Sequence, residues 1–127
     1  MAEYTITQAD IDPNGLIIDK EGSYSVIEDL EFNPEKFIYH GNVCDFPIPK
    51  MKMQDISVPF VITSPNVKIL FNNHKITNNS TIDHSAVFYM TNTDNIVVKD
   101  AHFYGFSQFH LCDDTAKKLE VENIAFN

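Results

Sequence analysis

The chain has 127 residues, 43% hydrophobic and 12% aromatic, so it is long and apolar enough to bury one core and is not intrinsically disordered. Its formal net charge of −9 would repel a nucleic-acid backbone or an anionic membrane surface. We therefore expect one domain over residues 1–127 that binds neither nucleic acid nor membrane.

The N-terminal sequence indicates a protein that stays inside the cell. Residues 1–5 contain no basic stretch followed by an apolar one, as a secretory signal would, and no run reaches the roughly 18 apolar residues of a membrane span. Two cysteines, Cys44 and Cys112, are too few for the disulfide framework of a small secreted domain. We expect an intracellular location, or a place within a virus particle.

Residues 1–55 are expected to lead into the repeats that follow and to cap them. Within this region, residues 41–55 break any strand pattern, because Pro47 and Pro49 cannot join a central ladder. Met51 and Met53 are adaptable apolar side chains. Two interpretations stay open for residues 41–55: a surface loop folded back on the domain, and an arm that contacts another chain.

Residues 56–127 contain a strand-like unit three times, at 66–76, 95–103 and 118–126. In each unit apolar residues alternate with period two, which indicates a strand with one apolar face. A corner of Asn or Asp follows each strand, since these residues tolerate a left-handed backbone. The equivalent residues are Val67, Ile96 and Leu119, then Ile69, Val98 and Val121, the corners Asn72-Asn73, Asp100 and Asn123, and the apolar anchors Ile76, Phe103 and Phe126.

A second apolar triplet precedes each unit, at residues 60–62, 88–90 and 109–111. Both markers return after roughly 21 to 29 residues, and such a period with two or three short strands per turn is typical of a β-solenoid. A leucine-rich repeat would need a helical return segment, and a β-sandwich would not return equivalent residues to equivalent positions. We predict two stacked ladders, one of Phe60, Phe88 and Phe109, the other of Ile76, Phe103 and Phe126.

The segments SPNVKILFNNHKIT (64–77) and NTDNIVVKDAHFYGF (92–106) resemble coils of the pectin-lyase-like superfamily of right-handed parallel β-helix proteins, and EGSYSVIEDLEFNP (21–34) resembles the segment that often leads into their first coils. The resemblance implies an all-β fold, a short right-handed parallel β-helix of about three to four coils. It leaves the activity open, because the superfamily includes lyases, hydrolases, phage tailspikes and non-catalytic structural proteins.

Asp94, Asp113 and Asp114 are the candidate catalytic residues. The resemblance implies this role, because polygalacturonase-type hydrolases use Asp residues from neighbouring coils, and paired carboxylates divide acid and base roles in glycoside hydrolysis. However, the Gly-His-Gly and Arg-Ile-Lys elements of those hydrolases are absent, and so is the Arg of a pectate lyase. The five His residues lack metal-ligand spacing, and no phosphate-binding Gly-rich loop is present. We expect no catalysis, metal or cofactor.

Two functions follow. The first is a non-catalytic structural or assembly protein that packs against other chains, as a homo-oligomer or in a larger assembly, with a virus-particle component as the specific case. A solenoid whose last strand has no cap exposes a strand edge and half-covered apolar side chains. The expected interface residues are Leu119, Val121, Ile124 and Phe126, with Met51 and Met53 in the arm.

The alternative is a carbohydrate-binding or carbohydrate-cleaving β-helix that uses an exposed face near Tyr89, Tyr104, Asp94 and Asp113.

Overall fold

The computed structural model describes residues 2–11, 15–33, 39–45, 50–79, 85–112 and 114–127, with backbone alone for 39–45 and 50–56. This part of the chain is mostly β-strand, and its one helix is α1 (Gln8–Ile11), a single turn. The expectation of an all-β chain therefore holds only in part. Two of the three sheets are parallel throughout, and the third is an antiparallel hairpin.

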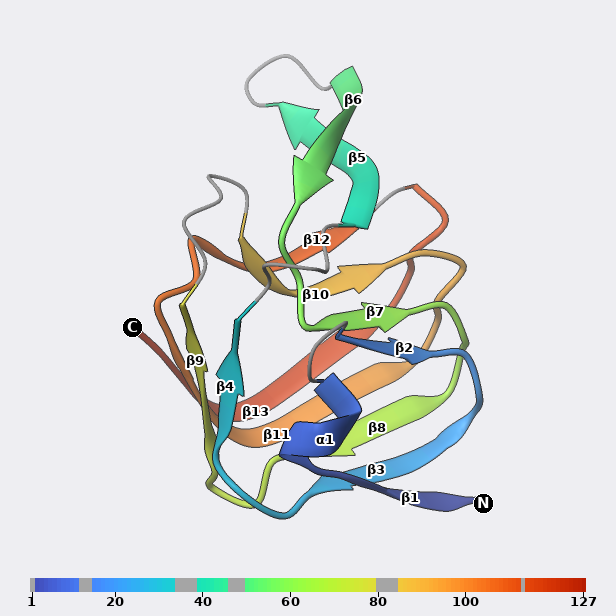
Figure 1. Ribbon diagram of the computed structural model, residues 1–127. Coiled ribbons are helices and arrows are strands. Elements are labelled where there is room, and N and C mark those ends of the chain that lie inside the picture. Colours follow the sequence, from blue (N-terminus) through green and yellow to red (C-terminus); the bar gives the residue numbers. More distant parts are fainter. Residues whose placement is uncertain (1, 12–14, 34–38, 46–49, 80–84, 113) are drawn as a thin grey trace.

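The larger parallel sheet has seven strands in the order β1-β3-β8-β11-β9-β4, with β13 paired to β11. The smaller has four strands in the order β12-β10-β7-β2, and it faces the larger one across the core (Figure 1). The strands of the larger sheet are β1 (Glu3–Ile6), β3 (Gly22–Val26), β4 (Leu30–Phe32), β8 (Val67–Leu70), β9 (Lys75–Asn78), β11 (Ile96–Tyr104) and β13 (Leu119–Phe126). The strands of the smaller sheet are β2 (Leu16–Ile18), β7 (Phe60–Ile62), β10 (Ala86–Met90) and β12 (Gln108–Cys112).

The chain passes from the smaller sheet to the larger one several times. The successive passes are β2 to β3 and β4, β7 to β8 and β9, β10 to β11, and β12 to β13. Each pass pairs in parallel with the pass before it, and β11 is long enough to pair with both β8 and β9.

The predicted equivalence of the three strand units is confirmed by the register. Val98 pairs with Ile69 of β8 and Val121 of β13. Phe103 pairs in the same way with Ile76 and Phe126, as the second predicted ladder requires. The apolar alternation therefore indicated both the strands and their partners, because a shift by one residue would turn every apolar side chain outward.

The polar corners also lie as predicted. Asn72, Asn73, Asp100 and Asn123 all have positive φ, between 53° and 66°, which Asn and Asp tolerate better than other side chains. The Asn123 amide donates to the Asp100 carboxylate at 2.9 Å, so the corners of β11 and β13 are joined by a side-chain hydrogen bond. A second amide stack precedes the strands: Asn95 donates to Asn66, and Asn66 donates to Glu21.

The first predicted ladder is only partly correct. Phe60 and Phe88 are register partners, and their rings stack with centroids 5.5 Å apart. Phe88, however, pairs with His110 and not with Phe109, although the Phe109 ring still packs at 5.6 Å from that of Phe88. Val87 and Phe88 both belong to the core cluster, so the strict alternation that the prediction assumed is broken at this point of β10.

Residues 41–45 and 50–55 lie in the two strands of a hairpin, a structure that neither sequence interpretation specified. β5 (Tyr39–Asp45) pairs antiparallel with β6 (Lys50–Ile56). Figure 1 shows this hairpin projecting from the two parallel sheets, with β5 in contact with β12 at its base. The side chains of Met51 and Met53 lie outside the described residues, so their predicted role at an interface stays a prediction.

The N-terminal end of the strand stack is closed. β1 pairs along β3, and the ring of Tyr4 stacks on that of Tyr24 with centroids 4.7 Å apart. α1 lies over the near end of the space between the sheets (Figure 1), and its Ile11 is buried in the core. At the start of the helix the Thr7 amide donates to the Asp10 carboxylate at 2.7 Å, which is one half of a capping box, and the Asp10 amide donates to the Thr7 backbone carbonyl at 3.0 Å.

Candidate functional site

At the C-terminal end of the stack, equivalent side chains of β11 and β13 are buried to different extents. The inward residues of β11, Ile96, Val98, Ala101 and Phe103, are fully buried. Their register partners in β13 are Leu119, Val121, Ile124 and Phe126, which are the predicted interface residues. Leu119 and Ile124 are partly buried, whereas Val121 is 52% exposed and Phe126 is 42% exposed. The same apolar pattern is thus fully buried in β11 and only partly buried in β13.

The exposure arises from the position of β13 in the sheet. β13 pairs with β11 on one side, and in the described part of the chain no strand pairs with its other side. β12 is likewise the last strand of the smaller sheet, and its Phe109 is only partly buried against the core. The two last strands together frame an apolar end surface, made of Phe109, Leu119, Val121, Ile124 and Phe126 and called the open end below.

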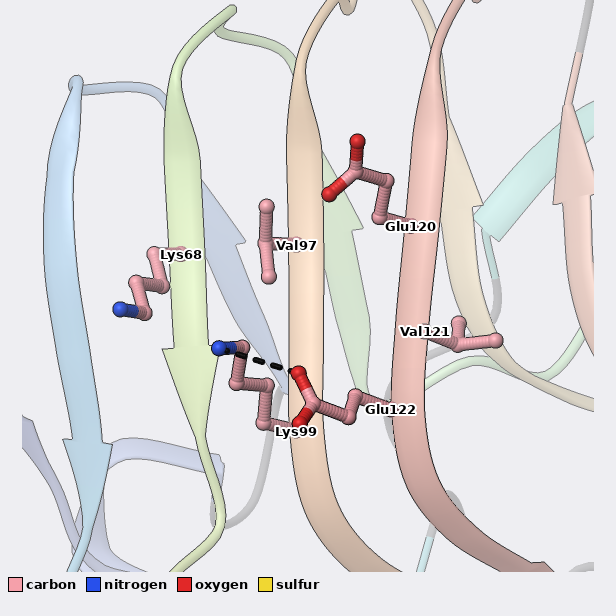
Figure 2. Close-up of a pocket in the computed structure, with 6 residues that line it drawn as sticks. All are labelled: Lys68, Val97, Lys99, Glu120, Val121 and Glu122. Carbon is pink, nitrogen blue, oxygen red and sulfur yellow. Dashed lines mark ion pairs between the residues drawn. The ribbon is translucent and has the colours of Figure 1, made fainter.

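Charged side chains line the outer face of the larger sheet beside the open end. Figure 2 shows Glu120 and Glu122 extending from β13 back toward β11, whereas Val121 extends to the side away from β11. The Lys99 ammonium lies 3.1 Å from the Glu122 carboxylate, and the Lys118 ammonium lies 3.3 Å from the Glu120 carboxylate. A shallow groove on this face is lined by Lys68, Val97, Lys99, Glu120, Val121 and Glu122. The edge strand therefore carries apolar residues on its inward side and ion pairs on its outward side.

The candidate catalytic residues are only partly brought together. Asp94 and Asp114 are both exposed and line one shallow hollow, with Thr93, Thr115 and Lys117. Asp113 lies outside the described residues. The hollow is polar and open, and its backbone is fixed by the Asn92 amide, which donates to the Thr115 hydroxyl at 2.7 Å. An acid for glycoside hydrolysis is usually held in a less hydrated setting that raises its pKa. The hollow offers Asp94 and Asp114 no such burial.

The exposed aromatic face proposed for a sugar is not formed by the two tyrosines together. Tyr89 is only 2% exposed, so the sequence interpretation of this residue was wrong. It packs on the outer side of the smaller sheet in a second apolar cluster with Val58, Val61, Ala86 and Leu111. Tyr104 is exposed, but it ends β11 in the larger sheet. Of these two tyrosines, only Tyr104 is therefore available to a sugar.

The described residues contain neither a metal-ligand cluster nor a membrane-spanning helix. Among them, no three His, Cys, Asp or Glu side chains come together as metal ligands would. No helix in that part of the chain is long and apolar enough to cross a membrane.

Sequence reasoning missed two features at the ends of the strand stack. Gln8 occupies the edge of β4 with its side chain: its amide nitrogen donates to the Glu31 carbonyl, and its amide oxygen accepts from the Glu31 backbone amide, both at 2.8 Å. The charges of β13 were also overlooked, although Lys118, Glu120 and Glu122 recur at every second residue. The two-residue period could have been recognised in the sequence. The contact of Gln8 with Glu31 could not, because it depends on how the chain folds between them.

The comparisons with known proteins add no family to this picture. No protein-family model matches the chain, and neither a curated protein nor a solved structure is significantly similar to it.

Proposed function

We propose that the chain is a short right-handed parallel β-helix with a non-catalytic, structural role, which packs against other protein chains through its open end. Four successive passes between the sheets supply the coils of such a helix. The stacked Asn and Asp corners, joined by side-chain hydrogen bonds, are the turns expected between them. A virus particle is our specific proposal for the assembly, because particles of this kind are built by repeated contacts between chains.

The observation that carries this proposal is the unequal burial of register partners at the open end. Val98 is fully buried and Val121 is 52% exposed, although the two residues are register partners. Burying an apolar side chain of this size is worth about 1.5–3 kcal/mol. A chain that covered the open end would therefore gain from several side chains at once, and it would also pair the free backbone groups of β13.

A carbohydrate-binding or carbohydrate-cleaving β-helix is the alternative, with Asp94 and Asp114 in one hollow as the observation in its favour. Release of reducing ends from polygalacturonate, lost in Asp114→Asn, would replace the structural proposal with this one. We expect no such release.

The mass of the native particle tests the assembly proposal. In extracts of the cells that produce the protein naturally, we expect it to sediment well above the 14.5 kDa of one chain. Val121→Lys should lower that mass, because it places a charge in the apolar end surface. Ile27→Lys is the matched control, since Ile27 is 55% exposed and its backbone amide donates to Ile6 of β1 at the closed end. A native particle of one chain, or equal effects of both substitutions, would overturn the proposal.

A further inference from the structure

We propose that the partner at the open end is a second copy of this chain, related by a two-fold axis beside Glu120, with the two β13 strands paired antiparallel. This inference rests on the proposed function, because it names the partner of the same surface. The larger sheets of the two copies would then join edge to edge around residues 118–122, and the Leu119 and Val121 side chains of the two open ends would cover each other.

The residue pattern of β13 carries this arrangement. In an antiparallel pair centred on Glu120, Leu119 of one copy lies opposite Val121 of the other, so apolar residues meet apolar residues on the inward side. On the outward side Lys118 lies opposite Glu122, twice, because a two-fold contact repeats each pair. Opposite charges across a strand pair are favourable, and like charges are unfavourable.

Ion pairs already present within one copy extend this pattern. Lys99 contacts Glu122 at 3.1 Å, and Lys118 contacts Glu120 at 3.3 Å. Across the joined edges the outward side chains would therefore alternate in sign: Lys99 and Glu122 of one copy, followed by Lys118 and Glu120 of the other. The two Glu120 carboxylates meet at the axis as one like-charge pair, and the Lys118 ammonium of each chain lies 3.3 Å from its own Glu120. The neighbouring same-face register that shifts the axis toward residue 121 would instead set Glu120 against Glu122 twice, which is unfavourable.

A head-to-tail stack of copies fits less well. The open end of one copy would have to meet the closed end of the next, where β1 is the last strand of the larger sheet and Gln8 occupies the edge of β4. The outermost strand there is β1, whose exposed Glu3 would lie beside the acidic outward side of β13. Like charges would face each other in that contact, whereas the two-fold contact sets opposite charges together. The charge pattern thus selects a closed dimer over an open fibre.

Reversing single charges at the β13 edge tests the arrangement. The mass of the purified chain is measured by sedimentation equilibrium. The wild type should form a particle of two chains. Lys118→Glu and Glu122→Lys should each weaken the dimer by roughly tenfold or more, because each sets two like-charge pairs across the edge. An equimolar mixture of the two variants should restore dimers, because in the mixed dimer both cross-strand pairs have opposite signs. Lys117→Glu changes the net charge equally one residue away, in the Asp94 hollow, and should leave the dimer intact.

Circular dichroism of each variant separates weakened association from unfolding, which matters for Glu122→Lys because it also breaks the Lys99 contact. If the purified wild-type chain is monomeric while the native particle is large, the partner is not a second copy of the chain. The proposed function would still stand. Dimers insensitive to both substitutions, or a mixture that fails to restore them, would overturn the two-fold register. A native particle of one chain would overturn both proposals.

Discussion

At the N-terminal end, the edge of β3 is paired by β1, and the edge of β4 is held by the side chain of Gln8. At the C-terminal end, the described residues leave β13 paired on one side, with Val121 and Phe126 largely uncovered. Natural β-proteins usually cover strand edges, because unpaired backbone groups and half-buried apolar side chains invite association. The chain buries the apolar side chains of one end with its own residues, so the other end is the surface that we propose for contact with a partner.

The largest expected difference is between the interior and the open end, and Phe103 with its register partner Phe126 measures it. Phe103→Ala should lower the free energy of unfolding by about 3–5 kcal/mol through lost burial and a residual cavity. Phe126→Ala should cost about half as much or less, because this ring is 42% exposed. Urea unfolding of both variants measures the difference. Equal losses would mean that the end of β13 is covered as well as the interior.

Ile11 and Val121 compare the two ends directly. Ile11 is buried at the closed end, so Ile11→Ala should cost about 2–4 kcal/mol of unfolding free energy. Val121→Ala should cost under about 1 kcal/mol in the isolated chain, since half of its surface already meets water. Thermal unfolding at low protein concentration keeps association out of this comparison. A larger loss for Val121 than for Ile11 would contradict the assignment of closed and open ends.

Gln8 tests how the closed end protects a strand edge. Gln8→Ala removes two hydrogen bonds to the Glu31 backbone, and we expect a loss of about 1 kcal/mol because the site is exposed. Hydrogen exchange should become faster at the Glu31 amide in particular. The control is Gln108→Ala, at an exposed residue of β12, which should leave exchange at Glu31 unchanged. Unaltered exchange in Gln8→Ala would show that the helix, not this side chain, protects β4.

The smallest expected effect is a pH dependence at the corner between β3 and β4. The Lys75 backbone amide donates to the Asp29 carboxylate at 3.1 Å and His74 lies 3.2 Å from it, so the pKa of Asp29 is lowered from its ordinary value of 3.8. A carboxyl whose pKa is lower in the folded state stabilises the fold above its unfolded pKa, and this stability is lost as the pH falls through the folded pKa.

Unfolding free energies measured from about pH 5 downward should therefore fall more steeply for the wild type than for Asp29→Asn. His74→Ala should reproduce a smaller part of that change, because the backbone amide is the leading cause of the shift. Identical acid profiles for the wild type and Asp29→Asn would contradict the assigned contact.

Sequence reasoning reached the strands of residues 66–126, the register of Phe103 with Ile76 and Phe126, and the left-handed corners at Asp100 and Asn123. These features are local, because side-chain alternation with period two and the backbone preference of Asn and Asp are written in neighbouring residues. The exposed apolar side of β13 followed from the same alternation.

Other features depend on residues far apart in the chain, and only the tertiary structure decided them. Tyr89 looked as exposed as Tyr104 in sequence, yet packing on the outer side of the smaller sheet buried it. The register that sets His110, and not Phe109, opposite Phe88 was likewise not predicted, and two consecutive side chains of β10, Val87 and Phe88, lie in the core. Gln8 reached the edge of β4 because α1 folded over the end of the stack. Alternation indicates which side chains face the core. The segments that cover them are determined by contacts between residues that are far apart in the sequence.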